Sequence, residues 1–261
     1  MSGATSTGAA VTLASGGPGW FIVPFILLVV ALAILGIWWE HRRRAERRRR
    51  YREIADRLGL EYTESPGLRL DQEFPAFTCF AQGHSRRLNH LLRGEIRSRE
   101  GHPNDVLAGE WQFSITVSNG KTTTTVTYRF GFVILGLRMG RCPAVAIRGE
   151  NLMDRLAGAL GWDDIDFESV EFSRRFHVKS EDKRFAYDLI DAHVMEHFLA
   201  ASPAPDLELA GVDLCLHRGV RKHLEPDGVA ALLDWGLQLV DRIPRLVRAG
   251  VAEGRYGAQG I

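Results

Sequence analysis

Two histidines and a glutamate lie within about one helical turn of each other in the C-terminal half of the chain. Residues 193–197 form an H-x-x-E-H pattern inside a segment, 182–200, that is predicted to be helical. His193 and His197 are four residues apart, so both imidazoles could bind zinc from one helix face, with Glu196 as a general base. The downstream glutamates that could complete such a site form no recognisable motif: Glu208, Glu225 and Glu253. We therefore favour two histidines on an amphipathic helix, and keep a zinc hydrolase as the alternative hypothesis.

Two further motifs resemble catalytic or nucleotide-binding loops only in part. Gly120-Lys121-Thr122 matches the end of a phosphate-binding loop, but Ile115 stands where its first glycine is required. Gly83-His84-Ser85 begins like a nucleophile elbow, but Arg87 occupies the place of the second glycine. The first motif is explained by a hairpin turn and the second by the end of a strand, so neither predicts an enzyme.

Three acidic residues alternate as they do at the start of a calcium-binding loop: Asp164, Asp166 and Glu168. Ser169 stands where such a loop needs glycine, and Arg175 stands where it needs a closing glutamate. An acidic turn that faces Arg174 or Arg175 is the simpler interpretation. The charged residues of this stretch form a candidate patch for a protein partner: Asp164, Asp166, Arg174 and Arg175.

The three cysteines give no metal or disulfide signal. Cys79, Cys142 and Cys215 are an odd number, lie more than sixty residues apart and include no C-x-x-C pair. This spacing disfavours a disulfide framework or a cysteine zinc site, and no cofactor is predicted. Reduced, buried thiols are typical of a cytosolic domain.

Charge is distributed very unevenly along the chain. Residues 1–39 carry no charged side chain, and eight arginines follow within residues 42–52. Residues 53–261 hold 25 basic and 30 acidic residues and are therefore net −5, which disfavours nucleic acid as a partner. The eight arginines are candidates for binding anionic lipid headgroups at a membrane surface: Arg42, Arg43, Arg44, Arg47, Arg48, Arg49, Arg50 and Arg52.

Residues 20–39 are predicted to be a single transmembrane helix. These twenty residues contain no charged or hydroxyl side chain, and at about 1.5 Å per residue they span a hydrocarbon core of about 30 Å. Trp20, Trp38 and Trp39 stand where interfacial aromatic residues occur. Because arginines flank only the C-terminal end, we expect the N-terminus outside the cell membrane and residues 40–261 in the cytoplasm.

The rest of the chain divides by its composition. The sequence predicts a disordered tail at residues 1–19 and a basic juxtamembrane helical stalk at 40–58, which ends at Gly59. The folded domain is predicted at 59–248 and a flexible C-terminal tail at 249–261.

Strands dominate the first half of the predicted domain. Residues 74–149 read as strands, and Asn119-Gly120 predicts a two-residue hairpin turn that pairs Ser118 with Lys121 and Trp111 with Tyr128. One face of this hairpin is expected to be core and the other solvated.

Helices and short strands follow. The pattern predicts helices at 151–160 and 182–200 and a third from Pro226 to Pro244, with extended pieces at 165–167, 172–178 and 212–216. This order indicates an α+β domain with a mainly antiparallel sheet and packed helices.

Several segments resemble a family of bacterial single-pass membrane-anchored proteins that carries a domain of unknown function. The matching residues are Leu58-Gly59-Leu60, Phe74-Pro75-Ala76-Phe77, Asn89, Gly94-Glu95, Asp164 to Glu168, Glu171 to Phe176 and the helix from Pro226. The chain departs from the family at residues 113–115 and in its tight hairpin turn. The resemblance implies architecture and membrane location, and no activity.

Together these observations predict a non-enzymatic domain that is tethered to the cell (inner) membrane and binds an unknown protein partner or the membrane surface. A membrane-anchored zinc hydrolase that uses His193, Glu196 and His197 is the alternative.

Overall fold

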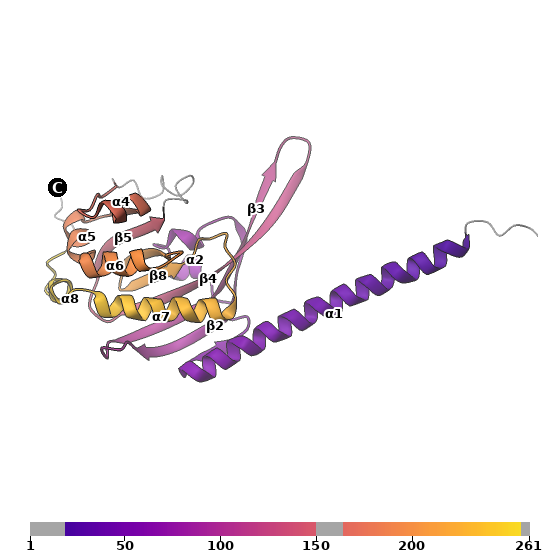
Figure 1. Ribbon diagram of the computed structural model, residues 1–261, viewed down its shortest axis with the longest axis horizontal. Helices are drawn as coiled ribbons and strands as arrows, with labels where there is room; N and C mark the ends of the chain where they lie inside the picture. The colour runs from indigo at the N-terminus through magenta and orange to yellow at the C-terminus, as the bar shows by residue number, and fades with distance from the viewer. Residues whose placement is uncertain (1–18, 150–163, 257–261) are drawn as a thin grey trace, which may run out of the picture. The chain divides into compact units, whose positions relative to one another are not determined.

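The structure is a computed structural model and describes residues 19–149 and 164–256. It contains a long N-terminal helix, an eight-stranded sheet and further helices, as Figure 1 shows. The predicted helix at 151–160 and the predicted tail at 1–19 lie outside the described residues, apart from Gly19. The chain divides into two compact units, Met1–Glu46 and Arg47–Ile261.

Helix α1, Gly19–Leu58, contains both the predicted membrane segment and the predicted stalk. The side chains of residues 24–46 are exposed. By length and composition, α1 can cross a membrane: its most apolar 18-residue window has a mean hydropathy of 1.8 and is not buried. The protein therefore has one N-terminal helix capable of membrane insertion within its described part.

The last turns of α1 belong to the folded domain. Tyr51, Ile54 and Ala55 follow the i, i+3, i+4 spacing of one helix face, and all three are buried in the core. The helix ends at Leu58 because Gly59 adopts a φ of +67°, as predicted. The compact unit thus begins at Arg47, inside the segment that the sequence predicts as a stalk.

The sheet is antiparallel throughout its named strand pairs, which confirms the predicted fold class. Its strand order is β1-β2-β3-β4-β8-β7-β5-β6. The strands are β1 Glu61–Thr63, β2 His84–Arg97, β3 Pro103–Ser118, β4 Thr123–Leu137, β5 Cys142–Gly149, β6 Phe176–Ser180, β7 Asp206–Gly211 and β8 Asp213–His217. The short helix α2, Leu70–Glu73, lies just before the segment predicted as strands, and the 3₁₀ helix η1, Thr78–Phe80, replaces part of that segment.

The β3–β4 hairpin forms, but the predicted register was wrong by two residues. Ser118 pairs with Thr123, and Trp111 pairs with Phe130. The turn has four residues because the side-chain oxygen of Asn119 accepts hydrogen bonds from the backbone N–H groups of Lys121 (3.1 Å) and Thr122 (2.9 Å). A shift of two preserves the face of every side chain, so the predicted core face is retained.

The outer part of this hairpin does not contact a core. In Figure 1 it extends beyond the rest of the sheet. Val117 is 60% exposed and Val126 is 40% exposed, whereas Trp111 and Phe113 nearer the base are fully buried. The prediction of one core face and one solvated face therefore holds for the base of the hairpin and fails at its end. We call this end, residues 116–126, the hairpin tip.

The helical part of the domain differs in detail from the predicted pattern. The segment 182–200 is two helices, α5 Lys183–Leu189 and α6 Ala192–Ala200, because Asp191 caps a new helix by accepting from the N–H groups of His193 and Val194. Helix α4, Val170–Arg175, replaces part of the extended piece predicted at 172–178. Helix α7, Pro226–Arg242, forms as predicted, and α8, Arg245–Ala252, extends into the predicted tail.

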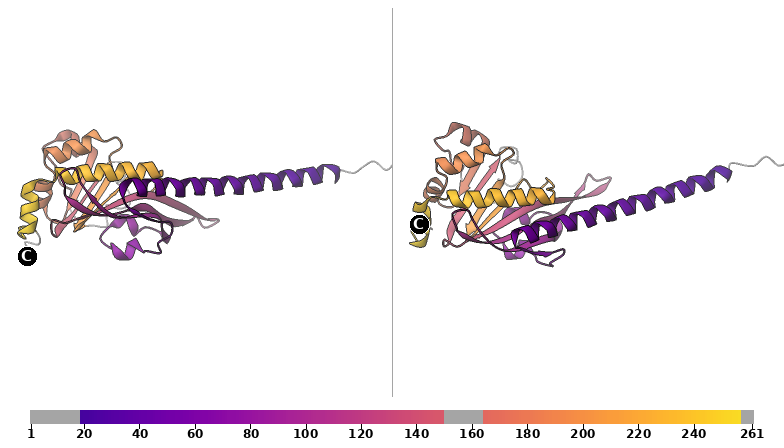
Figure 2. Two further views of the ribbon diagram at one scale, coloured as in Figure 1. Left: turned by 90° about the horizontal axis from the view of Figure 1, so that it is seen from below. Right: turned by 60° about the horizontal axis from the view of Figure 1, so that its bottom comes forward.

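Two hydrophobic clusters lie on opposite faces of the sheet. Figure 2 shows α7 along one face and the segment that holds α2 on the other. Along β4, Val133 and Leu135 belong to the α7 cluster, whereas Phe132 and Ile134 belong to the other, aromatic cluster. Gly236 of α7 permits close contact with the sheet, because a Cβ there would lie 2.6 Å from Cδ1 of Leu216. The sheet is thus the middle layer of the domain.

Candidate functional site

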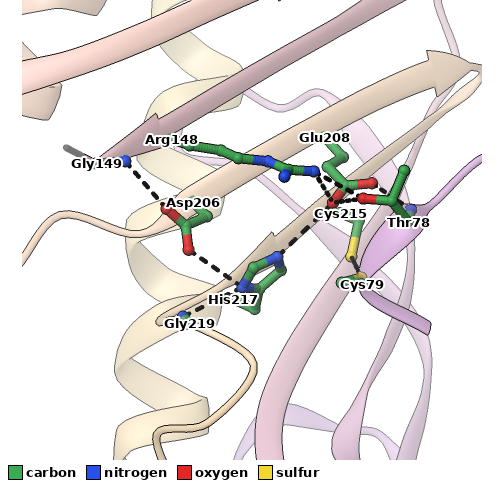
Figure 3. A network of polar contacts seen from close by, with 9 residues as sticks. All are labelled: Thr78, Cys79, Arg148, Gly149, Asp206, Glu208, Cys215, His217 and Gly219. Atoms are coloured by element: carbon green, nitrogen blue, oxygen red, sulfur yellow. Dashed lines mark hydrogen bonds and ion pairs between the residues drawn. The ribbon is translucent and has the colours of Figure 1, made fainter. Parts of the chain in front are cut away.

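A buried polar network lies on the α2 side of the sheet, next to the aromatic cluster. The register of β7 and β8 places Glu208 opposite Cys215 and Asp206 opposite His217. Arg148 of β5, together with Thr78 and Cys79 of η1, completes the network, as Figure 3 shows. Most buried polar groups in proteins have hydrogen-bond partners, so each exception in such a network requires an explanation.

Glu208 is the best-satisfied member of the network. Its carboxylate accepts hydrogen bonds from the backbone N–H (2.6 Å) and hydroxyl (2.9 Å) of Thr78, and it pairs with Arg148 at 3.1 Å. Burial raises the pKa of Glu208, but the neighbouring His217, Arg148 and Thr78 outweigh burial and lower it. Glu208 is therefore an ionised carboxylate inside the domain.

His217 lies between the two carboxylates. Its Nδ1 is 3.4 Å from Oδ2 of Asp206 and 3.1 Å from the N–H of Gly219. Burial lowers the pKa of His217, but its neighbours Cys79, Glu208 and Asp206 outweigh burial and raise the pKa to about 10. A positively charged His217 also fits the local charge balance. The buried carboxylates of Asp206 and Glu208 carry two negative charges, and the single guanidinium of Arg148 neutralises only one of them.

Two thiols border the same network. Sγ of Cys79 and Sγ of Cys215 are 3.8 Å apart, and both residues are fully buried. Burial raises the pKa of both thiols, so each is protonated in this state. All three cysteines are free and buried, as the sequence predicts.

The sequence did not reveal this network. Its members span residues 78–217, and no short motif joins them. The one local signal is the alternation of polar and apolar residues in β7 and β8, where Asp206, Glu208, Cys215 and His217 all point to one face. Only the strand pairing brings these four residues together.

The H-x-x-E-H residues are placed differently from a zinc site. Nε2 of His197 lies 3.1 Å from the carbonyl oxygen of Trp235, and the His197 ring stacks on the Trp235 ring at 4.3 Å. Burial lowers the pKa of His197. Within the described residues, neither His193 nor Glu196 nor His197 belongs to a group of three metal-ligand atoms.

A polar cleft of about 660 Å³ contains His193 and Glu196 in its walls. The turn after β2, the C-terminal end of α7 and helix α8 supply other charged groups, among them Glu100, Asp241 and Arg248. The Asp241 carboxylate already accepts the backbone N–H groups of Arg99 (3.1 Å) and Glu100 (3.3 Å). The cleft is thus a charged depression whose acidic groups are largely engaged by the protein.

The eight arginines do not form one uniform surface. Nε of Arg47 pairs with Glu110 at 2.6 Å, and its guanidinium also bonds the carbonyl oxygen of Leu224 at 2.7 Å. Arg48 pairs with Glu64 at 3.2 Å. Elsewhere in the block, Arg52 lies over the Tyr62 ring, Arg42 over the Trp38 ring and Arg43 over the Trp39 ring, Arg44 pairs with Glu40, and Arg49 and Arg50 pair with Glu53.

Two residues of the candidate partner patch, Asp164 and Arg175, make contacts within the domain. Asp164 lies 3.8 Å from the side chains of His177 and Lys179 instead of facing Arg174 or Arg175. Arg175 donates to the carbonyl oxygens of Leu199 and Ala201 at the end of α6. Asp166 and Arg174 are exposed.

The two motifs that partly resemble catalytic or nucleotide-binding loops have structural roles. His84 of Gly83-His84-Ser85 begins β2, and Gly120-Lys121-Thr122 lies in the hairpin turn, residues 119–122.

Comparison with known proteins shows the fold. No family model and no curated protein matches the sequence. The crystal structure of the mycobacterial trehalose monomycolate transport factor A, TtfA, is similar, with a TM-score of 0.51 and 13% sequence identity. The match covers 76% of this chain and 96% of that chain. The domain therefore has a TtfA-like fold, and the chain also carries one N-terminal helix that is long and apolar enough to cross a membrane.

Proposed function

We propose that this protein is a non-enzymatic accessory protein of the cell membrane, whose cytoplasmic domain binds a membrane protein partner. The observation that carries the proposal is the composition of α1. Its residues 24–39 are apolar and exposed, and its last turns bury Tyr51 and Ile54 in the domain core. One helix thus serves as both membrane anchor and part of the fold.

The name of TtfA describes a transport factor, which supports an accessory role over a catalytic one. The position of the arginines, all on the C-terminal side of the apolar segment, supports a cytoplasmic domain.

We further propose the hairpin tip as the surface that contacts the partner. An isolated two-stranded ribbon is marginally stable in water, and this tip exposes valines and threonines with Lys121 as its one charged side chain. Its side chains can add apolar contacts and backbone pairing to another protein.

Site-specific photo-crosslinking in native membranes tests this proposal. A photoreactive residue at Val117 of the full-length protein is expected to give a discrete crosslinked species that contains a membrane protein. The control is the same residue at Leu246, which is 57% exposed on α8 and should give no such species. Equal crosslinking at both positions, or none at Val117 and Val126, would rule out the hairpin tip as the contact.

A further inference from the structure

One nitrogen of the buried network has no hydrogen-bond partner among the described residues. It is Nε2 of His217, in a residue that is only 2% exposed. The nearest carboxylate oxygen, Oε1 of Glu208, is 3.9 Å away, which is too long for a hydrogen bond. A buried ring nitrogen in this state needs a partner that the protein does not supply.

Potential metal ligands surround this nitrogen. One ligand atom each from Cys79, Glu208 and His217 lies within 4.8 Å of the other two, and all three residues are buried. Sγ of Cys215 is 3.8 Å from Sγ of Cys79 and borders the same space. Ligand atoms in a tetrahedral zinc site are about 3–4 Å apart, so a small contraction of this cluster would suffice.

The surroundings of His217 resemble an outer shell for a bound metal. The Asp206 carboxylate lies 3.4 Å from Nδ1, so it can accept the proton in the Nδ1–H tautomer. That tautomer replaces the bond that Nδ1 accepts from the Gly219 N–H at 3.1 Å, and it leaves Nε2 free for coordination. Thr78 and Arg148 fix the Glu208 carboxylate from the other side. Figure 3 shows the imidazole directed at Glu208, with the thiols of Cys79 and Cys215 beside it.

We propose that Cys79, Glu208 and His217 bind one zinc ion, with Cys215 beside the fourth position. A thiolate and an imidazole select zinc over magnesium or calcium, and a closed site without solvent access is typical of structural zinc. Binding releases two protons to solvent, one from the Cys79 thiol and one from Nε2 of His217. Zn²⁺ with the thiolate and Arg148 then balances the charges of Glu208 and Asp206.

This site would not have been expected from the sequence, in which the cysteine spacing disfavours a zinc site. It adds to the proposed membrane function without depending on it, because the cluster lies wholly within the unit Arg47–Ile261.

Metal analysis of the full-length protein in detergent, purified without chelator and then incubated with zinc sulfate and desalted, tests the proposal. We expect about one zinc per chain in the wild type, and less than a tenth of that in Cys79→Ser and in His217→Gln. Cys142→Ser and His197→Gln are the matched controls and should keep the full amount, since neither residue lies in the cluster.

Substitution with cobalt(II) gives a second readout that does not depend on a variant being folded. The wild type should show thiolate-to-cobalt charge-transfer absorption, and Cys142→Ser should retain it. The proposal is overturned if the wild type binds no zinc and shows no such band. It is equally overturned if zinc persists in Cys79→Ser and His217→Gln but disappears in His197→Gln.

Discussion

Arg47 near the end of α1 donates to the buried carboxylate of Glu110 on β3, with 2.6 Å between Nε and Oε1. The Glu110 side chain is only 3% exposed, so this ion pair fixes the end of α1 to the sheet from within the protein. The arginine block therefore contains both residues that stabilise the fold, such as Arg47, and exposed residues, such as Arg44. Substitutions at these two positions distinguish the two roles.

Replacing Arg47 by Gln should lower the free energy of unfolding by about 2–4 kcal/mol, because it leaves the buried Glu110 carboxylate without its cation. The measurement is urea denaturation of a fragment of residues 40–261, which keeps the whole compact unit. Arg44→Gln is the control, since its pair with Glu40 is exposed, and its effect should stay within about 0.5 kcal/mol. Equal effects for both variants would contradict the role of the Arg47–Glu110 pair.

Binding to anionic lipid should depend mainly on the exposed arginines at the start of the block. The fragment 40–261 is expected to sediment with anionic vesicles at low salt and to be released as salt rises. Changing Arg42, Arg43 and Arg44 to Gln removes on the order of 1 kcal/mol each, or roughly 100-fold in affinity together. A fragment that begins at residue 53 is unsuitable as the control, because it lacks the buried Tyr51. Sedimentation that is independent of these three arginines would leave them as a topology signal only.

The stability of the domain should fall with acid, in part through His90. Burial lowers the pKa of His90, whose Nδ1 lies 2.8 Å from the hydroxyl of Tyr62. The unfolded chain therefore binds the His90 proton more readily than the folded protein does. The contribution of neutral His90 to the free energy of unfolding is complete above a pH of about 6.5. Below that pH the free energy of unfolding falls by at most about 1.4 kcal/mol per pH unit through His90.

His90→Asn is the informative variant, because His90 has a φ of +52°, a conformation that asparagine tolerates. Between pH 7 and pH 5 the variant should lose less unfolding free energy than the wild type. Identical slopes in the two proteins would show that His90 does not titrate in this range.

The hairpin tip should be dispensable for folding. In a variant that joins the paired residues Ile115 and Val126 through Asn-Gly, residues 116–125 are removed without touching the buried base of the hairpin. We expect the free energy of unfolding of the fragment 40–261 to change by less than about 1 kcal/mol. In full-length protein, a photoreactive residue at Val126 should give the membrane-protein crosslink in the wild type and lose it in this variant. A large loss of stability would assign the tip a structural role instead.

The sequence predicts the general architecture well because local signals determine it. The apolar run within α1, the stop at Gly59 and the Pro226 helix all follow from residue types and spacing. The hairpin register was wrong because the Asn119 side chain caps a four-residue turn, an alternative that the Asn-Gly pair does not exclude.

The candidate site could not be predicted for a different reason. Arg148, Glu208 and His217 meet only through the order of β5, β7 and β8 in the sheet, and η1 adds Thr78 from a distant part of the chain. The conspicuous H-x-x-E-H pattern instead packs His197 against Trp235. Sequence spacing reports on single elements, whereas this cluster depends on long-range pairing.

The topology of the chain tests the proposed membrane function most directly. A fluorescent protein that matures only in the cytosol is fused after Ile261 of the full-length protein, and its signal is measured in membranes before and after alkaline extraction. The proposed topology predicts fluorescence that stays with the membrane fraction, because in that topology α1 spans the bilayer and the arginine block keeps the domain on the cytoplasmic side. A fusion that is stably expressed but dark, or fluorescence that alkali releases from the membrane, would contradict a membrane-anchored cytoplasmic domain.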